Sequence, residues 1–299
     1  MKIMETYTNG VRISYDDLGR GEPALLMMPG WCANRTMFTY LAPQSSTSRR
    51  TLALDWRGHG QSGVAPADFG ECDLVNDALA VIEASGAESI IPVATAHSGW
   101  VALELHRRLG SRIPKLVLLD WIILEAPAPF MGALQAFQDP AQWEPAREQL
   151  FSLWLEGVDH PEVIRFVREE MGVYGFTMWA RAGREILAAY TQAGSPLKAL
   201  GELSPPASTL HLYSQPADPG YLAAQEAFAA EHPWFHVRRL SARSHFPMLE
   251  VPEVMAAEIE HFVASEERSL LGMKKRHEET KDAINGCGGS RLGQVKPSS

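Results

Sequence analysis

Short apolar runs of strand length alternate with segments of helical spacing along most of this 299-residue chain. The first four runs lie at residues 24–28, 51–54, 90–94 and 116–119. Runs this short and this apolar are typical of strands that are buried on both faces of a parallel sheet. Residues 74–84 and 101–109, which lie between runs, have helical spacing. The alternation therefore predicts a parallel sheet with helices on both faces.

Four further strands extend the predicted sheet. They are expected at residues 4–7, 11–15, 209–213 and 235–240. The first two flank Asn9-Gly10, a strong signal for a tight hairpin turn. A helix is expected at residues 222–230 between the last two strands, and a closing helix at residues 252–264. We expect an α/β protein with a mostly parallel sheet of eight strands.

Residues 125–200 interrupt the alternation. They are rich in Trp, Met and Phe, and helical spacing recurs at residues 149–155, 163–171 and 180–191. We interpret this stretch as a helical cap that is inserted into a core formed by residues 1–124 and 201–265. Residues 266–299 form a polar tail that we expect to be partly disordered, with a frayed helix near residues 274–283.

Composition excludes several classes of protein. Lys and Arg number 27 against 36 Asp and Glu, and this net charge of −9 argues against nucleic acid as a partner. Three scattered cysteines, Cys32, Cys72 and Cys287, form no disulfide framework, and no His or Cys pair has metal-ligand spacing. The N-terminus lacks an apolar signal sequence, and no apolar run is long enough to cross a membrane. We expect a cytoplasmic monomer or weak homodimer without a metal.

The segment after residues 90–94 identifies a particular fold. It reads Ala94-Thr95-Ala96-His97-Ser98-Gly99-Trp100. The sharp strand-to-helix turn of the α/β-hydrolase fold follows the pattern small–x–nucleophile–x–small, and this segment matches it with Ala96 at the position of the nucleophile. A second register makes Ser98 the nucleophile but puts Trp100 where a small residue is needed. We favour the first register, in which the nucleophile has been replaced by an alanine that cannot attack a substrate.

A second motif supports the same fold. It reads Asp55-Trp56-Arg57-Gly58-His59-Gly60-Gln61-Ser62 and directly follows residues 51–54. We expect Asp55 and Arg57 to brace loops and the glycines to form turns. We expect no catalytic role for His59.

A histidine and an aspartate complete the predicted site. His245 follows the last predicted strand, where this fold keeps its general base, although a loop histidine that only bonds a carbonyl is the structural alternative. The acid that orients it lies between the elbow and the histidine in the chain. Asp120 directly follows residues 116–119, whereas Asp218 lies in a proline-rich turn, so we favour Asp120. Backbone N–H groups of Trp31 and His97 would form the oxyanion hole.

A site of this kind can remove a proton and stabilise the resulting anion without covalent catalysis. That chemistry fits a substrate with an acidic hydroxyl next to a carbonyl. Two other readings remain. One is a hydrolase or lyase that uses Ser98 or an activated water, and the other is a ligand-binding protein without catalysis.

A wider set of residues resembles a known family. The set comprises Pro29-Gly30-Trp31-Cys32, Asp55-Trp56-Arg57-Gly58-His59-Gly60, His97, Gly99-Trp100, Leu119-Asp120-Trp121, Leu153-Trp154-Leu155, Trp179, Gly183-Arg184, Ser214-Gln215-Pro216, Glu231-His232-Pro233-Trp234-Phe235 and His245-Phe246-Pro247. Over about residues 10–264 the chain resembles the cofactor-independent 3-hydroxy-4(1H)-quinolone 2,4-dioxygenases. The stretches at residues 231–235 and 245–247 are the most specific part of the match.

The resemblance implies a reaction and a role for each site residue. His245, oriented by Asp120, would remove the 3-hydroxyl proton of a quinolone, and the anion would react with O2 without metal or organic cofactor. A peroxide at C2 would close onto C4, and the ring would open to N-acylanthranilate and carbon monoxide. Trp31 and His97 would supply the backbone donors. The expected pocket residues are Ala33, Thr95, Ala96, Trp121, Trp154 and Trp179.

Two departures from the family pattern bear on the substrate. The members that cleave quinaldine-derived substrates have His-Ser where this chain has Thr95-Ala96, and a histidine where it has Ala33. The smaller side chains leave room beside the C2 substituent. We therefore favour 2-alkyl-3-hydroxy-4(1H)-quinolones such as the 2-heptyl compound, a quorum-sensing signal, over the 2-methyl (quinaldine-derived) quinolone.

Overall fold

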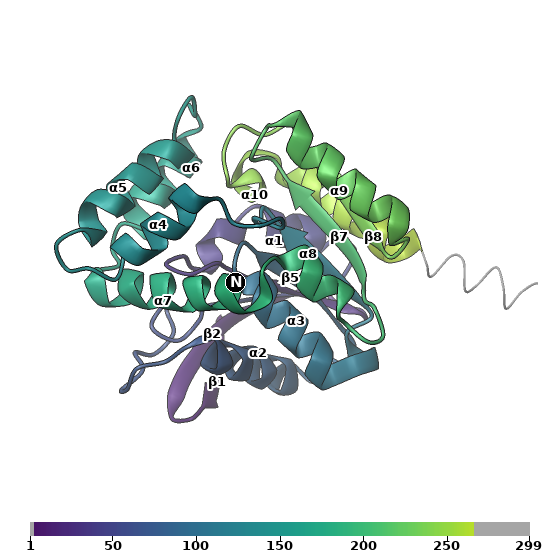
Figure 1. Ribbon diagram of the computed structural model, residues 1–299. Helices are drawn as coiled ribbons and strands as arrows, with labels where there is room; N and C mark the ends of the chain where they lie inside the picture. The colour runs from purple at the N-terminus through teal and green to yellow at the C-terminus, as the bar shows by residue number, and fades with distance from the viewer. Residues whose placement is uncertain (1–2, 266–299) are drawn as a thin grey trace, which may run out of the picture. The chain divides into compact units, whose positions relative to one another are not determined.

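The computed structural model describes residues 3–265 (Figure 1). It contains all eight predicted strands. The tail at residues 266–299, with the helix predicted near residues 274–283, lies outside the described residues. The strands are β1 (Ile3–Thr8), β2 (Val11–Leu18), β3 (Ala24–Met28), β4 (Thr51–Leu54), β5 (Ile90–Thr95), β6 (Lys115–Leu119), β7 (Ser208–Tyr213) and β8 (Phe235–Arg239). The first compact unit of the chain ends at Ile259, and residues 260–265 are the described part of a second unit.

The sheet has the order β1-β2-β4-β3-β5-β6-β7-β8. The pairs β1–β2 and β2–β4 are antiparallel, and the other five pairs are parallel. Asn9 and Gly10 both adopt left-handed backbone angles and form the predicted hairpin turn between β1 and β2. Because β5 lies between β3 and β6, its carboxyl end is surrounded by the ends of the other central parallel strands.

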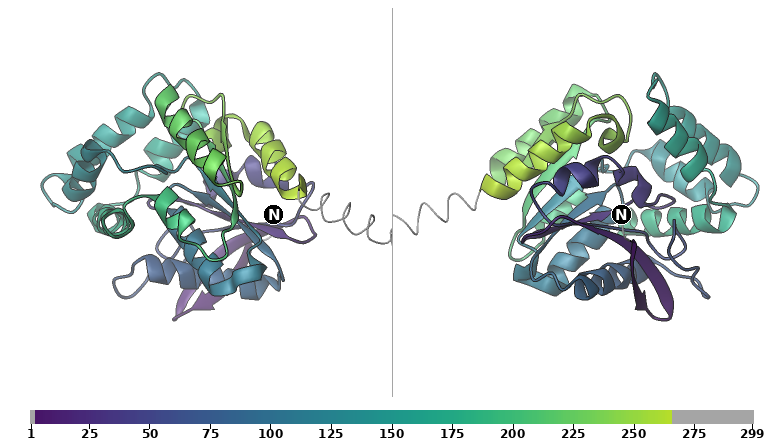
Figure 2. Two further views of the ribbon diagram at one scale, coloured as in Figure 1. Left: turned by 45° about the vertical axis from the view of Figure 1, so that its right-hand side comes forward. Right: turned by 180° about the vertical axis from the view of Figure 1, so that it is seen from behind.

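Helices cover both faces of the sheet. Helices α2 (Glu71–Ser85) and α3 (Ser98–Leu109) pack together on one face, and α1 (Leu41–Ser45) lies on the other (Figure 2). The other core helices are η1 (Arg35–Phe38), η2 (Gly110–Arg112), α9 (Pro219–Glu231), α10 (Pro247–Glu250) and a helix that begins at residue 252. No helix within residues 3–265 is long and apolar enough to cross a membrane.

The predicted insertion is helical throughout and separates β6 from β7. Its elements are α4 (Ala128–Ala136), α5 (Trp143–Trp154), α6 (Pro161–Arg165), the π-helical η3 (Phe166–Glu170), α7 (Phe176–Ala193) and α8 (Pro196–Gly201). The sequence predicted parts of α5, α6 with η3, and α7, but it did not predict α4 or α8. The division into core and cap at residues 125 and 200 stays a prediction.

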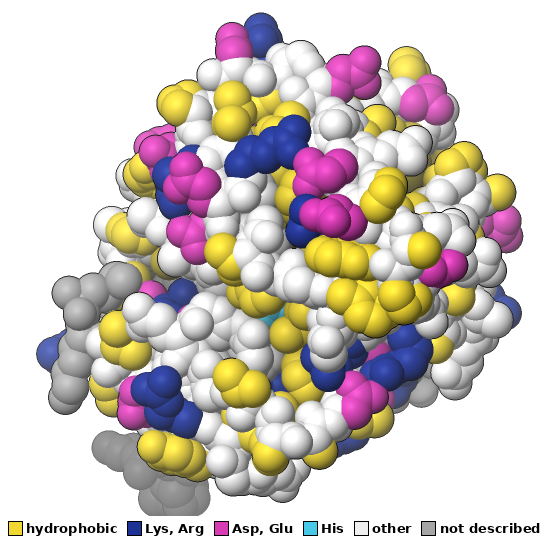
Figure 3. Space-filling view, turned by 90° about the vertical axis from the view of Figure 1, so that its left-hand side faces the viewer, with side chains coloured by type: hydrophobic (Ala, Val, Ile, Leu, Met, Phe, Trp, Pro, Cys, Tyr) yellow, Lys and Arg dark blue, Asp and Glu magenta, His cyan; other side chains and the backbone are white. Residues whose placement is uncertain are grey.

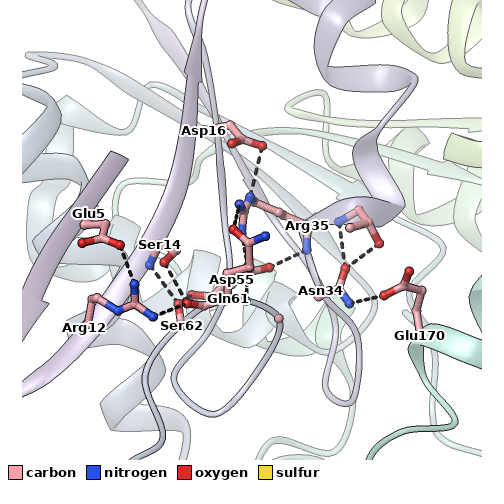
Figure 4. Close-up of polar contacts among 12 residues, drawn as sticks. Glu5, Arg12, Ser14, Asp16, Asn34, Arg35, Asp55, Gln61, Ser62 and Glu170 are labelled. Carbon is pink, nitrogen blue, oxygen red and sulfur yellow. Dashed lines mark hydrogen bonds and ion pairs between the residues drawn. The ribbon is translucent and has the colours of Figure 1, made fainter. Parts of the chain in front are cut away.

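Asp55 and Arg57 brace loops, as the sequence predicted. The Asp55 carboxylate accepts the backbone N–H groups of Arg35 at 2.7 Å and Gln61 at 2.8 Å, and it also pairs with the Arg35 guanidinium (Figure 4). Arg57 pairs with the buried Asp77 at 2.7 Å. Asp55 therefore joins the end of β4 to the segment that follows the β3 turn, whereas Arg57 joins it to α2.

The first turn of α3 packs tightly against the residue that follows Asp120. Trp121 lies so close to Gly99 that a Cβ at Gly99 would overlap its ring. The Trp121 ring also meets Trp100 edge to face, with 4.8 Å between the ring centroids. This contact explains why a small residue is required at position 99.

The Gly99→Ala variant should be less stable than the parent chain. Overpacking of this kind typically destabilises a core by about 1–3 kcal/mol, and thermal or urea unfolding would measure the loss. Gly132→Ala on α4 is the matched control, because a Cβ there meets nothing within 4 Å and alanine is the better helix former. Equal unfolding midpoints for the two variants would contradict this account of the packing.

Candidate active site

The elbow after β5 has the backbone conformation that the sequence predicted. Ala96 has a φ of 49°, in the left-handed region that non-glycine residues rarely adopt. Its N–H donates to the Leu119 carbonyl at 2.8 Å, and its carbonyl accepts the Gly99 N–H at 3.0 Å. The strained residue of the strand-to-helix turn is therefore Ala96, and the position of the nucleophile carries a methyl group.

Ser98 does not face a substrate. It is buried in the first turn of α3, and its hydroxyl lies 2.9 Å from the Thr95 carbonyl and 3.0 Å from the Met28 carbonyl. Both contacts are internal to the core, and Ser98 is absent from the pocket lining. This geometry gives no support to the register in which Ser98 attacks.

Asp120 and His245 lie together at the carboxyl edge of the sheet. Asp120 directly follows β6 and is buried, with a positive φ of 45°. Its Oδ1 lies 3.2 Å from the His245 Nδ1. Trp154 of α5 stacks on the other side of the imidazole, with 5.3 Å between centroids and 15° between planes. The imidazole is thus held by a carboxylate on one nitrogen and by an aromatic face.

The second carboxylate oxygen of Asp120 is held by a residue whose role the sequence did not predict. Oδ2 accepts the Ser214 N–H at 2.9 Å and lies 2.7 Å from the Ser214 hydroxyl. Because Ser214 follows β7, its place at the strand edge was the available signal. Asp218, the competing acid, instead caps α9 by accepting the Gly220 N–H at 2.9 Å.

Trp31 and His97 carry the two backbone N–H groups that the sequence predicts for an oxyanion hole. Trp31 and His97 both border the pocket beside Ala96. Within residues 3–265, neither N–H donates to a protein acceptor. His97 belongs to the elbow and Trp31 to the turn after β3, and unpaired backbone donors of this kind are suited to stabilise a developing negative charge.

His59 holds the loop that carries Trp31. Its Nδ1 donates to the Arg57 carbonyl at 2.9 Å, so its Nε2 is free to accept the Cys32 N–H at 3.1 Å. Cys32 has a φ of 54°, and this bond fixes that unusual backbone next to Trp31. The sequence predicted no catalytic role for His59, and the structure gives it a supporting one.

The pocket at this edge is mostly apolar and is formed by the core together with α4, α5 and α7. Five of the six predicted pocket residues line it: Ala33, Thr95, Ala96, Trp154 and Trp179. On the face that carries the insertion, hydrophobic side chains border a hollow with a histidine at its base (Figure 3). The prediction that Trp121 lines the pocket is wrong. Its ring packs against Gly99 in the first turn of α3, because the chain turns toward α3 directly after Asp120.

Three buried polar atoms in the pocket wall have no hydrogen-bond partner among residues 3–265. They are Thr95 Oγ1, His97 Nδ1 and Trp179 Nε1. Burial and the nearby His245 lower the pKa of His97 to about 3, so its imidazole is neutral at physiological pH. A bound molecule with its own donors and acceptors would satisfy these atoms.

Comparison with known proteins places this site in a family. The model of the alpha/beta hydrolase family matches residues 25–258. A 2-heptyl-3-hydroxy-4(1H)-quinolone dioxygenase of Mycobacteroides abscessus is 39% identical over 84% of this chain and 94% of its own length. The chain belongs to the 3-hydroxy-4(1H)-quinolone 2,4-dioxygenase family. The 1H-3-hydroxy-4-oxoquinoline 2,4-dioxygenase of Pseudomonas putida, another member, is 36% identical over 85% of this chain and 97% of its own length.

Solved structures of dioxygenases from this family share the whole fold. An AqdC variant in complex with its substrate, from work on ring cleavage of the Pseudomonas quinolone signal, superposes with a TM-score of 0.85. It is 37% identical and covers 88% of this chain and 100% of its own. Within residues 3–265, no group of three or more His, Cys, Asp or Glu side chains is arranged to hold a metal ion.

Acid should destabilise this dioxygenase through its buried histidines. Burial lowers the pKa of His59 to about 4, and those of His97 and His211 to about 3 and 4. An unfolded histidine titrates near about 6.5. Because the folded-state pKa values lie below that figure, these histidines contribute to the free energy of unfolding at neutral pH. The contribution is present in full above pH 6.5 and is lost as the pH falls toward 4. The free energy of unfolding should therefore decrease across this window.

The His59→Gln variant tests the contribution of one of these groups. A glutamine oxygen can accept the Cys32 N–H but binds no proton. The variant should therefore take up close to one proton fewer on unfolding. The slope of the unfolding free energy against pH should fall by about 1.4 kcal/mol per pH unit. Urea unfolding between pH 7.5 and 4.5 measures this slope. The exposed His261 provides the control variant His261→Gln. The same loss of slope in the control would contradict the assignment to burial.

Proposed function

We propose that this chain is a ring-cleaving dioxygenase of 2-alkyl-3-hydroxy-4(1H)-quinolones, with the 2-heptyl compound as a substrate. One observation carries the proposal. The elbow keeps its strained backbone, and its His97 N–H has no acceptor within residues 3–265, although Ala96 cannot attack, while His245 and Asp120 remain in contact. Such a site loses acyl transfer but keeps proton removal and anion stabilisation.

His245 acts as the general base in this proposal. The Asp120 carboxylate accepts a hydrogen bond from the His245 Nδ1–H, which leaves Nε2 as the basic nitrogen. Nε2 takes the 3-hydroxyl proton of the quinolone, and Asp120 stabilises the imidazolium that forms. The N–H groups of Trp31 and His97 stabilise the negative charge that is delocalised over the 3-oxygen, the ring and the 4-oxygen.

The anion then reacts with O2, which is the oxidant and a co-substrate. One oxygen atom of O2 bonds to C2 and the other closes onto C4. The bonds from C3 to C2 and C4 break, and C3 leaves with its own oxygen as carbon monoxide. C2 becomes the amide carbonyl and C4 the carboxylate of an N-acylanthranilate. The chain supplies a base, two donors and a largely apolar wall, and the step needs no group beyond substrate and O2.

The size of the pocket bears on how a long substrate binds. The free cavity measures about 60 Å³, which holds only a few water molecules. Sites for larger ligands occupy roughly 300–1,000 Å³. A quinolone with a heptyl chain therefore requires some of the lining side chains to move. Phe130, Leu150 and Ile186 of α4, α5 and α7 line the pocket on the side of the insertion.

An O2 electrode and carbon monoxide detection test the reaction directly. The wild-type chain mixed with 2-heptyl-3-hydroxy-4(1H)-quinolone under air should consume O2 and release carbon monoxide in equal amounts. If neither gas changes, the proposed function is wrong. Ester turnover that disappears in Ser98→Ala would instead support a hydrolase.

Removal of the base should abolish most of the turnover. General-base catalysis is typically worth about 10²–10⁴-fold, so His245→Ala should lower kcat by that order. Ser98→Ala is the matched control and should keep near the wild-type rate, since its hydroxyl bonds only core carbonyls. Near-normal turnover in His245→Ala would contradict the assigned base.

Ala33 is expected to set the room available to the alkyl chain. Its buried side chain lines the pocket next to the Trp31 loop. Ala33→Leu should lower kcat/KM more for the 2-heptyl substrate than for the 2-methyl analogue, because the added carbons fill space that only the longer chain needs. Steady-state kinetics with both substrates measure the ratio. Equal losses would show that Ala33 does not discriminate by chain length.

A further inference from the structure

We infer that Phe69 is a positioning residue that couples helix α7 of the insertion to the oxyanion hole, through a stack formed by Arg181, Phe69 and Trp31. The inference rests on the proposed function for its kinetic consequence, because Trp31 supplies one of the two proposed donors. Phe69 itself does not line the pocket. Its effect on the reaction would therefore be indirect.

The stack has three layers that come from three separate segments. The Trp31 and Phe69 rings are nearly parallel, with 5.9 Å between centroids and 14° between planes. The Arg181 guanidinium carbon lies 3.9 Å from the centroid of Phe69. Trp31 belongs to the turn after β3, Phe69 to the loop before α2, and Arg181 to α7. Phe69 and Arg181 are both buried.

Polar contacts clamp the Phe69 loop onto the same helix. Asp68 accepts hydrogen bonds from Arg181 at 2.9 Å and from Arg184 at 2.8 Å. Arg184 also donates to the Phe69 carbonyl at 3.1 Å. On the same helix, the Glu185 carboxylate accepts the Glu71 N–H at 2.8 Å. This carboxylate lies against Gly70, and a Cβ at position 70 would overlap it. The loop at residues 68–71 thus follows α7 closely.

The same helix also forms a wall of the pocket. Trp179, Ala182 and Ile186 line the cavity, whereas Arg181 and Arg184 lie on the side of α7 that faces the Phe69 loop. Any outward movement of α7 that admits a substrate must therefore act on Phe69, and through its ring on Trp31. Return of α7 over the bound substrate would restore the alignment of the Trp31 N–H. Such alignment matters because a displacement of about 1 Å can cost about 10²-fold in rate.

The simplest competing explanation is that Phe69 only fills the core. A purely structural role predicts lower stability but an unchanged environment for the bound anion. The two explanations are separated by the ionisation of the bound quinolone, which its absorbance spectrum reports without turnover when O2 is removed. If the stack aligns Trp31, breaking it should lower the anionic fraction of the bound quinolone even where the protein remains folded.

Two variants break the stack at different layers. Phe69→Leu keeps an apolar side chain but removes the flat ring, and Arg181→Met keeps the length of the side chain but removes the cation. Each should lower kcat by about tenfold, less than the 10²–10³-fold typical for loss of a whole donor. Each should also reduce the anionic fraction of anaerobically bound 2-heptyl-3-hydroxy-4(1H)-quinolone. Affinity for 2-heptyl-4(1H)-quinolone, which lacks the 3-hydroxyl, should stay close to that of the wild type.

Thr191→Val is the matched control. It changes an exposed residue of the same helix whose hydroxyl bonds the Leu187 carbonyl at 2.7 Å, so the loop at residues 68–71 and both rings keep their contacts and the bound anion should remain close to wild type. Arg181→Lys should recover part of the loss, because it keeps a cation near the Phe69 ring. An unchanged anionic fraction in Phe69→Leu, or an equal decrease in Thr191→Val, would overturn the inference.

Hydrogen exchange separates failure of this inference from failure of the proposed function. Mass spectrometry of the peptide that contains residues 30–34 should show faster exchange in Phe69→Leu and Arg181→Met than in Thr191→Val. This readout needs no substrate. If the wild type neither consumes O2 nor ionises the quinolone, the proposed function fails while the exchange result still decides the coupling. Unchanged exchange in both stack variants would refute the coupling even in an active enzyme.

Discussion

The left-handed backbone of Ala96 is the constraint on which the rest of the site depends. Holding a non-glycine residue in such a region costs of order 1–3 kcal/mol, and proteins retain such strain where it serves a function. In a hydrolase the turn exposes a nucleophile, but here it exposes a methyl group. What the turn still achieves is to leave the His97 N–H, which borders the pocket, without an acceptor among residues 3–265. On the proposed function, presentation of this donor explains why the strain is retained.

The contact between Asp120 and His245 does not depend on a nucleophile at position 96. Asp120 is buried, and an unpaired carboxylate there would be costly. Ser214 bonds its Oδ2, while the Gln215 N–H and the His245 Nδ1 both contact its Oδ1. The Trp154 face fixes the plane of the imidazole. None of these contacts requires a hydroxyl at position 96, so His245 keeps its place with alanine there.

The predictable parts of the structure are those in which local pattern and burial agree. The four central strands β3 to β6 follow from apolar runs, the hairpin of β1 and β2 follows from its Asn9-Gly10 turn, and the Ala96 register follows from the need for small residues near Gly99. The short helices α4 and α8 were missed, because nine and six residues give little periodicity. Trp121 was misplaced because its direction depends on how the chain turns after Asp120. Ser214 and His59 act through tertiary hydrogen bonds that no local pattern reports. Cytoplasmic location and oligomeric state stay predictions.

The walls of the pocket complete the difference between this site and that of a hydrolase. In a hydrolase, a substrate anion would lie beside a nucleophilic serine and water. Its reaction with O2 would then compete with acyl transfer to the serine and with hydrolysis. Here Ala96, Trp154 and Trp179 place hydrocarbon and aromatic surface around it. Exclusion of water strengthens the pull of the two N–H groups on the charge and removes the proton source that would quench it. O2 is small and apolar and enters such surroundings readily. On the proposed function, the same scaffold becomes an oxygenase because the alternatives to reaction with O2 have been removed.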